Sequence, residues 1–91
     1  MHKVDGYLVL HKGDLMHLGE NYMGPESSHA LWIGDSATVF KSRREAKEAI
    51  ALTISDRMAW LKTLENRTRP VEEDPFVCPD NYHIVAAIFN K

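Results

Sequence analysis

The feature that most constrains this chain is the stretch 42–64, whose residue pattern is that of one amphipathic helix. Ser42 is a favourable N-cap residue, and Glu45 three positions later completes the spacing of a capping box. At 100° per residue the apolar side chains fall within an arc of roughly 140°, the width of a stripe that packs on a core. The stripe consists of Ala46, Ala49, Ile50, Thr53, Ile54, Trp60, Leu61 and Leu64. We expect strands to cover it.

Length and composition limit the fold to one small core. The chain has 91 residues, of which 44% are hydrophobic and 26% charged, and no apolar run is long enough to span a membrane. We therefore expect a single soluble domain over residues 1–91. Folding at this length buries only about 60–65% of the unfolded surface, which leaves room for one helix on one small sheet. A deep enzyme pocket is disfavoured.

Charge and cysteine content exclude several classes of protein. The formal net charge of −2 and the pI near 6.2 lack the basic excess of a non-specific nucleic-acid binder. Cys78 is the only cysteine of the sequence, so an internal disulfide and a multi-cysteine zinc site are excluded. The opening residues MHKVDGYLVL lack the cationic region and long apolar core of a signal peptide, which predicts a cytoplasmic location.

The first residues predict a β-hairpin. Residues 4–11 alternate β-forming side chains on two faces, and Gly13-Asp14 follows as a turn that would pair His11 with Met16. The return strand is expected over residues 15–18. In the longer version of this prediction it resumes around Tyr22 and Met23.

A third strand and a short helical turn are predicted before the helix. Residues 29–33, HALWI, form an apolar run that ends at Gly34. Asp35 or Ser36 would then cap a single helical turn. The side chains that this turn places against the sheet would be Ala37 and Phe40.

The residues after the helix predict a surface connector and a final strand. Residues 65–81 contain three prolines and an acidic run, and we expect Phe76 and Val77 to hold this connector to the core. Residues 82–90 have apolar side chains on both faces and should lie inside the sheet. The predicted fold is α+β: an antiparallel sheet of three to four strands packed against one long helix, in the order β-β-β-α-β. The alternative is a mixed sheet whose last strand is parallel to a neighbour.

Arg57 does not fit the apolar stripe of the helix, because it falls about 20° from the centre of that stripe. A charged group there must extend to solvent, pair with a carboxylate or face a site. Thr53 and Asp56 repeat the spacing of a capping box, so the helix is also a candidate to break or bend there and turn Arg57 out of the core.

The stretch 32–46 resembles a pattern of small phage and prophage accessory proteins. The residues that carry the resemblance are Trp32, Asp35, Ala37, Phe40, Ser42, Glu45 and Ala46. Members of this group share no single activity, so the resemblance assigns no catalytic residue. It implies a mobile element inside a bacterial cell, where several such proteins block host defence by binding a protein, a nucleic-acid site or a signalling nucleotide.

Two catalytic or metal-binding arrangements are weakly indicated. His11, Asp14 and His17 have the residue types of a metal site, but the predicted hairpin leaves His17 opposite Leu10, so the two imidazoles need not converge. Cys78 and His83 have the residue types of a thiol nucleophile and its base. Cys78, however, lies in an acidic connector, without the cation or helix N-terminus that activates a thiol. We therefore predict no enzyme, metal or cofactor.

Two charged clusters are candidate binding residues. Arg43, Arg44 and Lys47 lie at the predicted start of the helix, where backbone N–H groups favour a phosphate. The acidic run would suit a basic partner surface, and its residues are Glu72, Glu73 and Asp74. For both clusters the commoner alternative is an ordinary solvated surface. On the back of the helix, Leu52, Met58 and Ala59 could form a homodimer interface, although scattered apolar surface residues are normal.

Together these observations favour a non-enzymatic binding protein. The leading hypothesis is an inhibitor encoded by a phage or another mobile element, which acts by stoichiometric binding to a host defence protein or complex in the bacterial cytoplasm. The alternative is a protein that binds or sequesters a nucleotide at a dimer interface. In that case Arg57 and Arg43, with an aromatic such as Trp32 or Tyr82, would hold the ligand.

Overall fold

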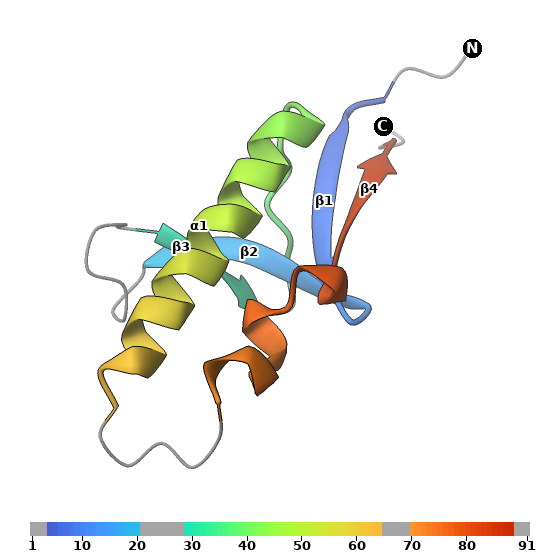
Figure 1. Cartoon of the computed structure of the whole chain (residues 1–91). Helices are drawn as coiled ribbons and strands as arrows, with labels where there is room; N and C mark the ends of the chain where they lie inside the picture. Colours follow the sequence, from blue (N-terminus) through green and yellow to red (C-terminus); the bar gives the residue numbers. More distant parts are fainter. Residues whose placement is uncertain (1–3, 21–28, 65–69, 89–91) are drawn as a thin grey trace.

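The structure, a computed structural model, describes residues 4–20, 29–64 and 70–88. In these residues one helix, α1 (Arg43–Lys62), packs on an antiparallel sheet in the spatial order β3-β2-β1-β4 (Figure 1). The strands are β1 (Gly6–His11), β2 (Asp14–Glu20), β3 (His29–Ile33) and β4 (Tyr82–Ala87), and three short 3-10 turns precede β4, namely η1 (Val71–Glu73), η2 (Pro75–Val77) and η3 (Pro79–Asn81). The predicted α+β class and element order are confirmed. The mixed-sheet alternative is wrong, because β4 is antiparallel to β1.

The hairpin between β1 and β2 turns one residue earlier than predicted. Lys12 and Gly13 have φ values of 50° and 89°, as the two central residues of a type I′ turn require. His11 therefore pairs with Asp14 and not with Met16, because Gly13 is the second turn residue rather than the first. The continuation of β2 around residues 22–23 lies outside the described residues.

The segment 34–40 closes a gap within the sheet. After its first two residues β2 leaves β1 and pairs with β3 instead. In the space that opens, Tyr7 and Phe40 exchange two backbone hydrogen bonds of 2.8 Å. The helical turn predicted at Asp35 or Ser36 is wrong, because residues 35–36 form a bend and residues 37–39 have no regular structure. The N–H groups of Gly34 and Thr38 instead donate to carbonyls of β2. As a result β1 has neighbours on both sides.

β4 is an edge strand, which corrects the prediction that it lies inside the sheet. All six of its residues pair with β1, and β4 is the last strand in the spatial order. Tyr82 is buried, but His83, Val85 and Ala86 are exposed. The prediction took two apolar faces as the sign of an interior strand. That sign is valid only when a layer covers each face of the sheet, and here α1 covers one face (Figure 1).

The helix begins where the capping pattern predicts. The Ser42 hydroxyl accepts the Glu45 N–H at 3.1 Å. The Glu45 carboxylate in turn accepts the N–H of Lys41 at 3.1 Å, one residue before the usual partner in a capping box. Two backbone donors at the start of the helix are thereby satisfied, which stabilises a helix start by roughly 1 kcal/mol.

The helix continues through residues 53–56, so the predicted break is wrong. The Thr53 hydroxyl donates to the Ala49 carbonyl at 2.7 Å, within the same helix, instead of capping a new one. The helix ends at Lys62, and Leu64 beyond it is 40% exposed although it was assigned to the apolar stripe.

The core consists of a main cluster between the sheet and α1 and a smaller one near the C-terminal end of α1. Val9 and Met16 are fully buried, and burial of each such side chain stabilises the fold by about 1.5–3 kcal/mol. The other buried members of the main cluster are Leu31, Phe40, Ala46, Ile50 and Tyr82, and the small cluster consists of Leu61, Val71 and Val77. Phe76 packs against the main cluster, so Phe76 and Val77 do hold the connector, as predicted. None of the described helices has the length and apolar character needed to cross a membrane.

Candidate binding pocket at the edge of the sheet

A pocket of about 250 Å³ lies along the outer edge of β3. Four consecutive residues of the strand, 30–33, line it, together with Thr53, Asp56 and Arg57 of α1 and Phe76 of η2. Because successive side chains of a strand point to opposite faces, a cavity that touches four in a row lies at the edge of the strand. β3 is the terminal strand of the sheet, so no strand of residues 4–20, 29–64 or 70–88 lies beside this edge.

The helix covers one point of this edge and leaves the next one open. The Leu31 N–H donates to the Thr53 hydroxyl at 3.0 Å, and this hydroxyl also donates within the helix. In an antiparallel ladder the backbone groups of every second residue point to the same side. The N–H and C=O of Ile33 therefore point outward as those of Leu31 do, and the Ile33 side chain is 45% exposed.

Arg57 forms one wall of the pocket and pairs with Asp74. Its Nη2 donates to Asp74 Oδ2 at 2.9 Å and its Nε donates to Oδ1 at 3.3 Å, a bidentate geometry with both side chains largely buried. The guanidinium also lies over two rings, at 5.2 Å from the Phe76 centroid and 5.3 Å from the Trp60 centroid. Arg57 was expected to extend to solvent, to pair with a carboxylate or to face a site. The structure shows that it pairs with a carboxylate and lines a pocket.

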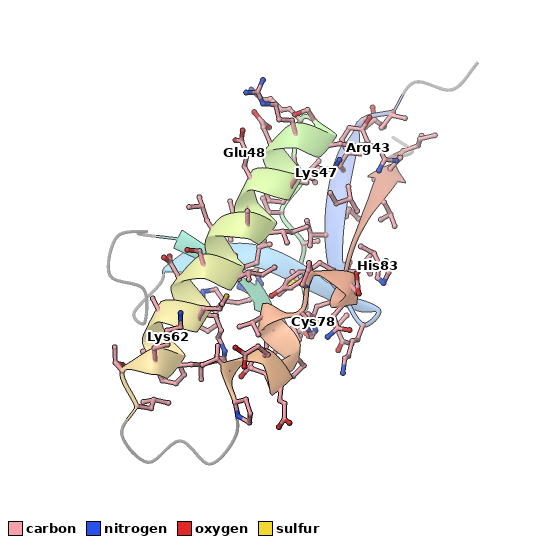
Figure 2. All side chains as sticks on the ribbon, in the orientation of Figure 1. Arg43, Lys47, Glu48, Lys62, Cys78 and His83 are labelled. Atoms are coloured by element: carbon pink, nitrogen blue, oxygen red, sulfur yellow. The ribbon has the colours of Figure 1, made fainter. Side chains whose placement is uncertain are left out.

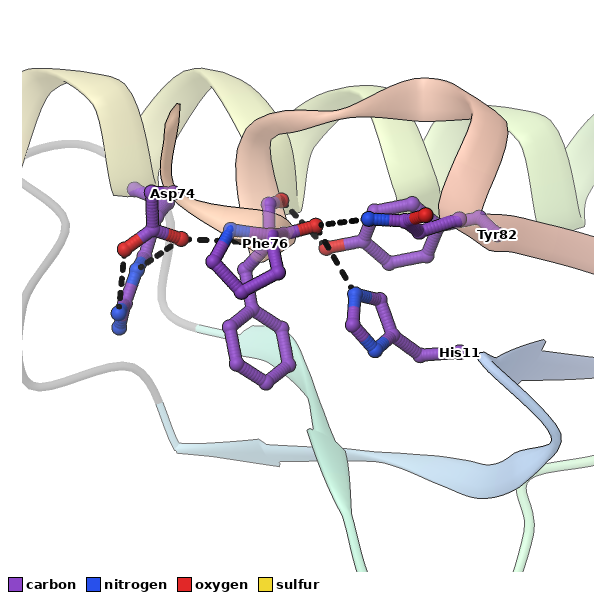
Figure 3. A network of polar contacts seen from close by, with 7 residues as sticks. His11, Asp74, Phe76 and Tyr82 are labelled. Carbon is purple, nitrogen blue, oxygen red and sulfur yellow. Dashed lines mark hydrogen bonds and ion pairs between the residues drawn. The ribbon is translucent and has the colours of Figure 1, made fainter. Parts of the chain in front are cut away.

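Asp74 and His11 hold Phe76, the neighbouring part of the pocket wall, in place (Figure 3). Asp74 accepts the Phe76 N–H at 2.8 Å, which caps η2. His11 is 3% exposed, and its Nε2 donates to the Pro75 carbonyl at 3.0 Å. The imidazole is stacked on the Phe76 ring at 4.3 Å between centroids and meets the Tyr82 ring edge-on at 4.9 Å. Phe76 is thus fixed by an ion-paired residue on one side and by β1 on the other.

Tyr82 links β4 to the same wall. Its hydroxyl donates to the Phe76 carbonyl at 2.6 Å. Burial raises the pKa of Tyr82 from 10.0 to about 12, an effect that the nearby Arg57 opposes and Asp74 reinforces. The hydroxyl therefore stays protonated as a donor across the physiological range. Asn81 adds a second donor to the Pro75 carbonyl, at 2.8 Å.

The charge of the pocket does not favour an anionic ligand. The guanidinium of Arg57 is already matched by the Asp74 carboxyl group, and a second carboxyl group, that of Asp56, lines the cavity and is 9% exposed. Because the Asp74 carboxylate already holds the guanidinium in a bidentate pair, this is a poor site for phosphate. The remaining lining is mostly apolar or aromatic, which suits an apolar group.

The structure brings only some of the predicted binding residues together. Arg57 and Asp74 form a pair, and Trp32 lines the same pocket as Arg57. Arg43 lies fourteen residues before Arg57, about 20 Å along the helix axis at 1.5 Å per residue, so these two do not grip one ligand. Tyr82 contacts the pocket wall from behind, through Phe76.

The two charged clusters are separate surfaces. Arg43 lies over the Tyr7 ring at 5.1 Å, and Arg44 pairs with Glu48 at 3.3 Å on a fully solvated part of α1. Lys47 is exposed beside them (Figure 2). Near the other end of the helix Glu72 and Glu73 are exposed on η1, whereas Asp74 is directed into the pair with Arg57.

The candidate metal and thiol residues occupy other environments. The imidazole of His11 is committed to Pro75 and Phe76, as described above. In the described parts of the chain no group of three or more His, Cys, Asp or Glu side chains could hold a metal ion. Cys78 is half-buried between η2 and η3, and His83 is exposed on β4 (Figure 2).

Sequence reasoning named Trp32 and Arg57 together but missed the pocket itself and the rest of its lining. Ile33 was assigned only to a strand and Phe76 only to a surface anchor. Thr53 and Asp56 were singled out by their spacing, but as a helix break. A usable signal was the presence of two polar residues, Thr53 and Arg57, within the arc of the apolar stripe, with Asp56 at its border. Such residues indicate that this part of the stripe faces something other than a closed core.

Comparison with known proteins adds no relative. No family model matches the chain, and no match was found among curated proteins or solved structures. The site must therefore be interpreted from its own chemistry.

Proposed function

We propose that this protein is a non-enzymatic binding module whose pocket beside β3 receives an apolar side chain of a partner protein. The observation that carries the proposal is that four consecutive residues of an unpaired strand edge line the cavity together with the helix. A strand edge offers backbone hydrogen bonds to an extended segment, and a pocket beside it selects one side chain of that segment.

The size of the cavity supports a side chain over a small-molecule ligand. Its volume of about 250 Å³ is below the range of roughly 300–1,000 Å³ that is typical of pockets for drug-sized ligands. A single large apolar side chain of a partner is of suitable size. Because the helix already occupies the Leu31 N–H, the partner segment would pair beyond that point, with the backbone of Ile33.

The more specific form of this proposal is a stoichiometric inhibitor encoded by a phage or another mobile element and directed at a host defence complex. Its support is the resemblance of residues 32–46. Trp32, which belongs to that pattern, lines the pocket. An inhibitor of this kind needs a partner-binding surface and no catalytic group.

The nucleotide alternative has one supporting observation, namely that Arg57 and Trp32 line the same cavity. The bidentate pairing of Arg57 with Asp74 weighs against a phosphate there. A nucleotide would instead have to use Arg43, Arg44 and Lys47 at the start of the helix.

Selection from a displayed library of random peptides tests the proposal. We expect enriched peptides to share one large apolar residue and to bind with micromolar dissociation constants by calorimetry. Ile33→Asp, which places a charge at the pocket, should weaken binding at least about 30-fold, since burial of an unpaired charge costs more than 2 kcal/mol. The matched control is Val85→Asp, on the other edge strand, where the wild-type side chain is 38% exposed against 45% for Ile33.

Two results would contradict this function. One is a set of selected peptides whose binding is equally sensitive to both substitutions. The other is tight binding of a cyclic or linear nucleotide to the protein alone, with loss of binding in Arg43→Ala but not in Ile33→Asp. Co-purification with a host defence complex that Ile33→Asp abolishes would support the inhibitor specifically.

A further inference from the structure

α1 carries a second apolar surface, on the side that faces away from the main core cluster. At 100° per residue its members lie within about 120° of the helix surface. They are Glu48, Ala51, Leu52, Ser55, Met58, Ala59 and Lys62. Leu52 is 54% exposed, whereas Met58 and Ala59 are half-buried and Met58 also packs against the small core cluster. A shallow hollow is lined by Ala51, Ile54, Ser55, Met58, Ala59 and Lys62. This surface, which we call the outer helix face, is distinct from the β3 pocket.

The outer helix face is symmetric in its chemistry about Ser55. Glu48 and Lys62 lie seven residues before and after Ser55, at opposite ends of the helix (Figure 2). Two alanines, Ala51 and Ala59, lie four residues to either side. The large apolar residues, Leu52 and Met58, lie three residues to either side. Each residue thus has a complementary counterpart at the mirrored position of the same helix.

We propose that this face binds a second copy of the chain, with the two α1 helices antiparallel and a two-fold axis at Ser55. In this arrangement Glu48, which also pairs with Arg44 of its own helix, faces Lys62 of the other copy. Alanine faces alanine, and Leu52 faces the half-buried Met58. The contact is isologous, as closed dimers require. A parallel pair would instead place Glu48 against Glu48 and Lys62 against Lys62, which is repulsive at both ends.

The small residues determine how closely the helices approach. Ala51, Ser55 and Ala59 follow one another at intervals of four, so they form a row with no long side chain. The pocket residues Thr53, Asp56 and Arg57 belong to the opposite side of α1. The dimer therefore leaves the β3 pocket accessible, and its failure would not affect the proposed function. One helix pair buries a small interface, for which we expect a micromolar dissociation constant.

Sedimentation velocity over a concentration series tests the charge arrangement. Glu48→Lys and Lys62→Glu should each weaken dimerisation about tenfold, because each replaces two ion pairs per dimer by two repulsions. The double variant should recover to within about threefold of the wild type. Lys41→Glu, an exposed residue before the helix with the same charge change, should have no effect. A wild type that is monomeric at several hundred micromolar, or a double variant no better than either single one, would overturn the proposal.

Disulfide cross-linking tests the orientation directly. In a Cys78→Ser background, Ser55→Cys should cross-link with itself on mild oxidation, because the two-fold axis brings the two copies of residue 55 together. Glu48→Cys alone should not cross-link, whereas an equal mixture of Glu48→Cys and Lys62→Cys should. Cross-linking of Glu48→Cys with itself would indicate a parallel pair and contradict the proposed antiparallel dimer. All three positions are exposed, so circular dichroism should show unchanged helix content.

Discussion

The two ends of the sheet are both unpaired strand edges, but they have different surroundings. β3 pairs with β2 through five residues, and α1 and η2 lie beside its free edge and form a pocket with it. β4 pairs with β1 through six residues, and the residues that follow Tyr82 along it are largely exposed. A strand edge becomes a recognition groove only when another element stands beside it and supplies walls.

The same contrast extends to how the two edges are protected from unwanted pairing. At β3 the Thr53 hydroxyl occupies the Leu31 N–H, which leaves a shorter stretch of free backbone. Length does not separate the two edges, because β4 has six residues and β3 has five. The difference is that α1 and η2 stand beside β3 and form a pocket there. We therefore expect specific recognition at β3 and little at β4.

The largest effect is expected from Asp74→Ala, which removes the support of the β3 pocket. The substitution leaves the largely buried Arg57 without its carboxylate and the Phe76 N–H without an acceptor. It should lower the free energy of unfolding by about 3 kcal/mol, as measured by urea denaturation. Glu73→Ala, at the exposed neighbouring position, should change it by less than about 0.5 kcal/mol. Equal effects would show that the pocket wall needs no ion pair.

Alkaline pH should weaken the hydrogen bond by which Tyr82 of β4 contacts Phe76 in the wall of the β3 pocket. Below pH 10 the tyrosine is protonated in both the folded and the unfolded chain. Between pH 10 and about 12 the unfolded chain loses this proton while the folded chain retains it, so stability falls as pH rises, by up to about 2–3 kcal/mol.

The control for this pH effect is Tyr82→Phe, which has no proton to lose. It should be less stable than the wild type at pH 8, by about 1 kcal/mol for the lost hydrogen bond to Phe76, but should show a shallower decline above pH 10. Identical pH slopes for the two proteins would contradict the assignment of the raised pKa to Tyr82.

A smaller effect is expected from Thr53→Val, which uncaps β3 while keeping the shape of the side chain. Loss of the buried bond to the Leu31 N–H should cost about 1–2 kcal/mol and speed hydrogen exchange of that amide. Thr38→Val removes a similar bond, to the Leu18 N–H, at an exposed place within the sheet. There water replaces the hydroxyl, and the cost should be below about 0.5 kcal/mol. A reversed order would mean that the cap on β3 is not a protected contact.

The sequence by itself determined the local elements of this protein. The start of α1 at Ser42, the strand at residues 29–33 and the order of elements follow from signals that lie within a few residues of each other. A capping hydroxyl acts on an N–H three residues away, and a glycine acts on its own turn. Such signals are short in range, so they can be recognised without knowing the rest of the fold. For the same reason the predicted turn, at Gly13-Asp14, differs by only one residue from the observed turn at Lys12-Gly13.

Only the tertiary structure decided which strands are edges and where a pocket forms. The apolar residues of β4 are compatible with an interior or an edge position. In the structure β4 pairs with one side of β1, and the other side of β1 pairs with β2 and with Phe40 of the segment 34–40. Arg57 was marked as dissonant by its position, but its partner, Asp74, is seventeen residues away across a connector. Long-range partners are chosen by how the layers pack, because many pairings of similar apolar and charged residues are nearly equal in energy until the whole core is assembled.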